Sequence, residues 1–202
     1  QPVMDSDFAS SGEICILEGQ DVLLDKGYTK IEDIQPGDTI DGSEIHKVFK
    51  QPAGQCVVKF SKDCFGVNVP DSDVYVTHDH LMYDPNTQKM KNASMFIGEY
   101  ESVEFCEPPR ESVYNILMKE WKVITVNNTK CESLCPFTPQ GVDTLIEQGV
   151  YDQSFRDFVV ECVHIETIDD ICVQGNTIVI NDMTPVMKQK KTLECSKAGV
   201  TC

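Results

Sequence analysis

Residues 21–40 read DVLLDKGYTKIEDIQPGDTI. Two runs with apolar and β-branched residues, Asp21–Leu24 and Thr29–Ile34, stand on either side of the turn-forming residues Asp25–Gly27. The second run ends at another turn, Pro36–Asp38. Because Gly, Pro and Asp favour turns and β-branched residues favour extended backbone, this stretch predicts two short strands joined by tight turns.

The same pattern continues along the chain, with turn residues at intervals of about 8 to 12 residues, which is typical of an all-β body. Further strands are predicted at Val57–Phe60, Phe65–Val69, Val74–Val76, Ser112–Ile116 and Lys122–Val126. The character changes near Pro136. After it, helices are predicted at Val142–Gln148 and Gln153–Val160, and strands at Cys162–Ile168 and Asn176–Ile180. The sequence therefore predicts a β body followed by a mixed extension, residues 136–202.

The charge balance excludes several classes of partner. The 202 residues hold 17 basic and 33 acidic side chains, a formal net charge of −16. Such a surface repels nucleic acid and anionic lipid. The apolar runs are far shorter than the roughly 20 residues of a membrane-spanning helix, and no targeting segment is visible in this chain. We therefore expect no nucleic-acid partner and no membrane span, and the compartment stays open between cytoplasmic and secreted.

The cysteine content leaves two interpretations. Ten cysteines occur without any C-x-x-C motif, and the closest pair is Cys131-x3-Cys135, so a zinc ribbon or a thioredoxin-like site is not indicated. We expect neither a metal nor a cofactor. The even number permits five disulfides, but free cysteine is also a common small core residue. Asn92-Ala93-Ser94 and Asn127-Asn128-Thr129 fit the glycosylation sequon, which is short enough to occur by chance.

The segment Val76-Thr77-His78-Asp79-His80 is the richest in chemistry-bearing residues. It can be a turn capped by Thr77 and Asp79 with solvated histidines. It can supply metal ligands from His78, Asp79 and His80, although the sequence names no further ligand. Alternatively, Thr77 and His80 polarise a carbonyl group and donate to a peptide nitrogen, which requires a nucleophile elsewhere. Cys15, immediately before the first strand, is the candidate nucleophile.

Four blocks in this order resemble the Hint domain that Hedgehog C-terminal domains and inteins share. They are Cys15 with residues 21–40, Thr77-x-x-His80, Val113-Tyr114-Asn115-Ile116, and Val123-Ile124-Thr125-Val126-Asn127-Asn128. The resemblance implies an all-β horseshoe of short strands with pseudo-twofold symmetry over residues 15–135. It also implies a single-turnover, self-cleaving reaction on the chain's own backbone.

In that reaction the Cys15 thiol attacks the carbonyl of Ile14, and the N–S acyl shift leaves a thioester that water or another nucleophile opens. By resemblance, Thr77 and His80 hold and polarise the Ile14–Cys15 bond, and His80 protonates the departing nitrogen. The substrate is then the chain's own upstream segment, residues 1–14, and the acceptor is a small nucleophile.

Departures from the family pattern refine this expectation. Asn115, expected as a hydrogen-bond acceptor, stands where many inteins have Asp, and the terminal His-Asn that splicing needs is absent. The layout therefore resembles the Hedgehog-like or Vint-like members, which cut only at the N-terminal side. Cys131 is a secondary candidate, as a packed residue or a second nucleophile. His164, Asp169 and Asp170 in the extension are either catalytic additions or a solvated strand end.

Two alternatives to the cleaving domain remain open. Ile14 is β-branched and crowds its own carbonyl, which is compatible with an inactive module of the same fold. The acidic composition and the cysteines are compatible with a disulfide-bearing β domain that binds a basic partner.

Overall fold

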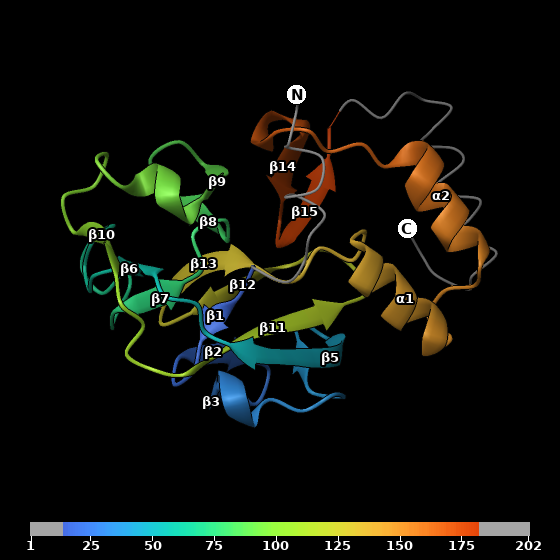
Figure 1. Ribbon diagram of the computed structural model, residues 1–202, viewed down its shortest axis with the longest axis horizontal. Coiled ribbons are helices and arrows are strands. Elements are labelled where there is room, and N and C mark those ends of the chain that lie inside the picture. The colour runs from blue at the N-terminus through green and yellow to red at the C-terminus, as the bar shows by residue number, and fades with distance from the viewer. Residues whose placement is uncertain (1–13, 182–202) are drawn as a thin grey trace.

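A computed structural model describes residues 14–181 of the chain (Figure 1). The expected all-β body with a mixed C-terminal extension is confirmed: the described residues form two large sheets, a small β-hairpin and two α-helices. The first sheet has the order β10-β6-β7-β1-β11-β5-β4, and the second has the order β3-β2-β12-β13-β8-β9. The strands of the first sheet are β1 (Ile16–Leu17), β4 (Thr39–Ile40), β5 (Ser43–Pro52), β6 (Val57–Phe60), β7 (Val74–Val76), β10 (Val103–Cys106) and β11 (Ser112–Met118). Those of the second are β2 (Asp21–Leu24), β3 (Gly27–Lys30), β8 (Leu81–Asp84), β9 (Lys89–Asn92), β12 (Val123–Val126) and β13 (Thr129–Glu132).

The main core contains apolar residues from both sheets. Ile16, Val76 and Tyr114 of the first sheet belong to one buried cluster with Met82 and Ile124 of the second. Successive side chains of a strand point to opposite faces, so the residues between these core positions face away from the main core. Cys15, Leu17 and Val113 form a separate buried cluster on that other face.

The extension after Pro136 packs on the body through two further clusters. Helices α1 (Pro139–Glu147) and α2 (Ser154–Cys162) bury apolar residues against Leu117 of β11 and Leu134. Hairpin strands β14 (Ile171–Gln174) and β15 (Thr177–Ile180) pack against Trp121, Leu81 and Met90. Thr138 caps the N-terminus of α1, and its hydroxyl accepts a hydrogen bond from Gly141 N at 3.1 Å. The extension therefore covers apolar residues of the body in two clusters separate from the main core.

Three predicted strands need correction. In the run Thr29–Ile34 the strand ends at Lys30, because Ile31–Asp33 form a 3-10 turn that buries Ile31. Phe65–Val69 form a turn in which Gly66 and Asn68 have positive φ, and Phe65 packs in an aromatic cluster. In Cys162–Ile168, Cys162 ends α2 and residues 163–167 have no regular structure. In each run part of the apolar set packs in the interior, as Ile31 and Phe65 do, but the run does not continue as a paired strand.

The hairpin between β12 and β13 turns at Asn127 and Asn128, which both have positive φ. Such a two-residue turn matches the twist of the flanking strands, and asparagine tolerates this conformation. The Asn127 side chain is buried: its carbonyl accepts from Asp21 N at 2.9 Å and its amide donates to Asp73 O at 3.1 Å. The sequon at Asn127 is therefore closed to a glycan in the folded protein.

Helices α1 and α2 have nine residues each, and within residues 14–181 no helix is long and apolar enough to cross a membrane.

Candidate functional site

Strand pairing brings Cys15 next to Thr77, although 62 residues separate them. Cys15 directly precedes β1, whose Ile16 pairs with Val76 of β7 on one side and with Tyr114 of β11 on the other. The Cys15 N–H donates to Thr77 Oγ1 at 2.8 Å, and the Thr77 N–H donates to the Cys15 carbonyl at 3.0 Å. The amide nitrogen of the Ile14–Cys15 bond is therefore held by the Thr77 hydroxyl.

The same register places two amide side chains beside Cys15. Because Ile16 pairs with Tyr114, Cys15 lies next to Asn115 on the face away from the main core. Leu17 pairs with Val113, which in turn pairs with Gln51 of β5, so Gln51 belongs to this face as well. Cys15, Thr77, Asn115 and Gln51 thus share one face of the first sheet.

Asn115 contacts the carbonyl of the bond that the sequence nominates for cleavage. Its Nδ2 donates a hydrogen bond to Ile14 O, and its Oδ1 accepts from Ile116 N at 2.8 Å. The second bond fixes the orientation of the amide, because only Oδ1 can accept. Asn115, expected as an acceptor, therefore also acts as a donor to the Ile14 carbonyl, where negative charge would develop during attack.

The Cys15 thiol is buried and neutral at physiological pH. Its residue is 3% exposed, and burial raises the pKa of the thiol to about 11, because the thiolate is poorly solvated there. Gln51 Nε2 donates to Cys15 Sγ at 3.2 Å, a contact that acts to lower this pKa. No sequence motif pointed to Gln51, and its placement depends on register across three strands.

His80 lies on the other side of Thr77, and its imidazole is fully buried. Its main-chain N–H donates to Thr77 O at 3.1 Å, while Nε2 lies 3.0 Å from the main-chain oxygen of Glu132. A carbonyl oxygen only accepts, so Nε2 carries the hydrogen and Nδ1 has a free lone pair. Nδ1 has no hydrogen-bond partner, and burial lowers the pKa of His80 to about 4. At neutral pH the His80 imidazole is therefore uncharged, and its Nδ1 lone pair is free.

Glu132, which the sequence did not nominate, is fully buried behind His80. Its carboxyl group accepts from Trp121 Nε1 at 3.2 Å and from Leu81 N at 3.3 Å. Burial raises the pKa of this carboxyl group to about 8. Glu132 is therefore mostly protonated at neutral pH.

The remaining sequence candidates lie apart from these contacts. His78 and Asp79 are on a solvated turn, with His78 Nε2 3.1 Å from Asp79 Oδ2. Cys131 is fully buried in the main core opposite Ile124. In the extension, the His164 ring contacts Glu161 O at 3.3 Å, and Asp169 and Asp170 form a capped 3-10 turn, so none of the three contacts the residues around Cys15.

The described part of the chain holds no group of three or more His, Cys, Asp or Glu residues that could bind a metal ion. Its eight cysteines are all free thiols.

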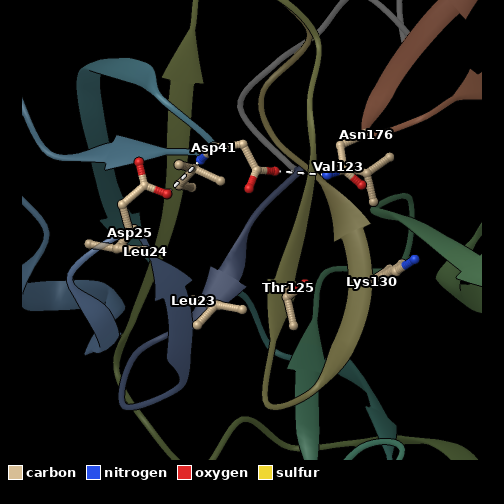
Figure 2. Close-up of a pocket in the computed structure, with 9 residues that line it drawn as sticks. Leu23, Leu24, Asp25, Asp41, Val123, Thr125, Lys130 and Asn176 are labelled. Atoms are coloured by element: carbon tan, nitrogen blue, oxygen red, sulfur yellow. Dashed lines mark hydrogen bonds between the residues drawn. The ribbon is translucent and has the colours of Figure 1, made fainter.

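A cleft of about 470 Å³ lies on the second sheet, between β2, β12 and the start of β15 (Figure 2). Leu23, Val123 and Thr125 line it together with two aspartates. These carboxylates are engaged within the protein: Asp25 accepts from Asp41 N at 2.8 Å, and Asp41 accepts from Asn176 Nδ2 at 2.8 Å. The cleft shares no residue with the group around Cys15, and its Asp41–Asn176 contact joins the β14–β15 hairpin to the body.

Comparison with known proteins gives structural similarity only. No family model and no curated protein matches the sequence. Similar solved structures include a bacterial intein-like domain from Clostridium thermocellum, at 12% identity and TM-score 0.41, covering 59% of this chain and 97% of that one. A DnaB intein from Synechocystis sp. PCC 6803 has 12% identity and TM-score 0.43, with 60% and 99% covered. The gp41-1 intein has 14% identity and TM-score 0.41, with 59% and 98% covered.

Proposed function

We propose that residues 15–135 form a Hint-type self-processing module that cleaves the Ile14–Cys15 peptide bond once, by an N–S acyl shift. One observation carries the proposal. The buried Cys15 thiol belongs to the same residue whose amide nitrogen is bonded by Thr77, while the carbonyl on the other side of that bond is bonded by Asn115. The nitrogen and the oxygen of the scissile amide thus each have a hydrogen bond with a polar side chain.

In the first step, Cys15 Sγ loses its proton and forms a bond to the carbonyl carbon of Ile14. Asn115 Nδ2 donates to the oxygen that becomes negatively charged, which is the role of an oxyanion-hole donor. Loss of one such donor typically slows acyl transfer by about 10²- to 10³-fold.

In the second step, the bond between the Ile14 carbon and the Cys15 nitrogen breaks, and the nitrogen takes up a proton to become an amine. In this proposal the thiol proton moves to the free Nδ1 lone pair of neutral His80, and the lowered pKa of His80 then favours delivery of that proton to the leaving nitrogen. Thr77 keeps that nitrogen in position through its hydroxyl group.

The product of these steps is a thioester on Cys15, which water, a thiol or another small nucleophile opens. Residues 1–14 and whatever precedes them are then the released acyl segment.

The extension after Pro136 has a structural role in this proposal. Leu117, two positions beyond Asn115 on the same face of β11, is covered by the cluster that includes the helices. Splicing is not part of the proposal, because the terminal His-Asn that splicing requires is absent and Asn128, the asparagine followed by Thr129, lies in the turn between β12 and β13.

The test uses the full chain with a longer N-terminal fusion partner, incubated with dithiothreitol or hydroxylamine. Thiols and hydroxylamine open thioesters far faster than amides, so cleavage reports the intermediate. Mass spectrometry should show a cut between Ile14 and Cys15, and Cys15→Ala should abolish it. His80→Ala should slow it by roughly 10²-fold. The matched control is Cys56→Ala, which removes an exposed thiol and should cleave at the parent rate. Cleavage of Cys15→Ala at the parent rate would overturn the proposal.

A further inference from the structure

Gln51 reaches Cys15 from two strands away. It is the penultimate residue of β5, and the row Gln51, Val113, Leu17 runs across β5, β11 and β1. From this row its Nε2 donates to Cys15 Sγ at 3.2 Å. The contact therefore depends on the relative register of three strands.

The surroundings of the sulfur are otherwise mainly apolar. Cys15 clusters with Leu17 and Val113, and Ala53 and Tyr75 pack against this cluster. A thiolate formed there loses most of its hydration, and burial opposes its formation. An amide NH₂ group has hydrogens and no available lone pair, so it can only donate to the sulfur. Such a donor favours the anionic sulfur over the neutral thiol.

We propose that Gln51 is a further catalytic residue, which stabilises the thiolate of Cys15 while it attacks the Ile14 carbonyl. This inference rests on the proposed function. The thiol proton leaves to the Nδ1 lone pair of His80, the S–C bond forms, and the C–N bond breaks as before. Two neutral amides then divide the developing charge, with Gln51 at the sulfur and Asn115 at the carbonyl oxygen. A carboxylate at position 51 would instead repel the attacking anion.

The experiment compares Gln51→Glu and Gln51→Met with the parent in the full chain. Gln51→Glu keeps the shape and removes the donor, and Gln51→Met removes the polar group while keeping the length. The matched control is Gln55→Glu, the same substitution at an exposed position four residues further on. Fluorescence of the single tryptophan, Trp121, verifies that each variant is folded.

Two rates are measured at one pH: alkylation of Cys15 by iodoacetamide, followed on its own peptide by mass spectrometry, and cleavage by dithiothreitol. A hydrogen bond to a charged group is worth about a 10- to 100-fold change in rate. Both Gln51 variants should be slower than the parent by that factor in alkylation and in cleavage. Gln55→Glu should match the parent in both rates. If either folded Gln51 variant alkylates at the parent rate, the inference is wrong.

The two readouts separate this inference from the proposed function. Alkylation needs only the thiolate, so it reports on Gln51 whether or not the chain cleaves. If the parent chain never cleaves, the proposed function is refuted, and with it the catalytic role of Gln51. If the parent cleaves and the Gln51 variants react at the parent rates, only the inference about Gln51 is refuted.

Discussion

Replacing the buried Glu132 with Gln should change how the stability of the fold depends on pH. The carboxyl group lies at 1% exposure between Trp121 Nε1 and Leu81 N, where burial raises its pKa from 4.5 to about 8. Between these values the folded chain keeps a proton that the unfolded chain has lost. This contribution to stability is complete below about pH 4.5, falls steadily as the pH rises from there, and is fully lost once the pH has passed about 8.

The slope follows from linkage. One extra proton in the folded state lowers the free energy of unfolding by about 1.4 kcal/mol per pH unit, or about 3 kcal/mol from about pH 5.5 to about pH 7.5. Glu132→Gln removes this term, because an amide does not titrate. Any hydrogen bond that the amide fails to replace shifts the stability by the same amount at each pH, so it does not affect the slope.

The assay is urea unfolding at several pH values, followed by Trp121 fluorescence and by far-UV circular dichroism. Cys15→Ala is present in every sample to prevent cleavage. The difference in unfolding free energy, Glu132→Gln minus Glu132, should rise with pH at the slope given above. Glu101→Gln, at an exposed turn position, should give a profile parallel to that of the parent. Parallel profiles for Glu132→Gln and the parent would refute the reasoning.

Three further outcomes are expected. Asn115→Leu removes the donor to Ile14 O and should slow dithiothreitol cleavage by about 10²- to 10³-fold, as measured by gel densitometry; an unchanged rate would remove Asn115 from the mechanism. With distinct tags at both ends of the chain, mass spectrometry should find N-terminal cleavage only, and a product carrying both tags but lacking residues 15–128 would contradict this. Leu145→Ala removes a fully buried side chain of α1 and should lower the unfolding free energy by about 2 to 5 kcal/mol. Trp121 fluorescence should show a single unfolding transition, and a separate early transition would show that the extension unfolds independently.

The pattern of turn residues and β-branched runs was sufficient to predict the all-β body, the strands at Asp21–Leu24, Val57–Phe60 and Val74–Val76, and both helices. These features depend on local backbone preference and on amphipathic periodicity. The long strand Ser43–Pro52 was not predicted, because its sequence SEIHKVFKQP mixes charged and apolar residues and its extended conformation comes from pairing with Ser112–Met118. Phe65–Val69 shows the opposite case, in which local alternation suggested a strand that tertiary packing uses as a turn.

The sequence by itself nominated the residues to which the proposed function assigns the chemistry, because Cys15, Thr77 and His80 stand in motifs a few residues long. The tertiary structure decided which groups they meet. Antiparallel register across β7, β1, β11 and β5 places Thr77, Asn115 and Gln51 on the face that holds Cys15, and the contact of His80 with Glu132 O fixes which imidazole nitrogen is free. A one-residue slip in any of these pairings would turn the side chains to the opposite face. Local sequence specifies the alternation along a strand, but only the packed sheet specifies the register between strands.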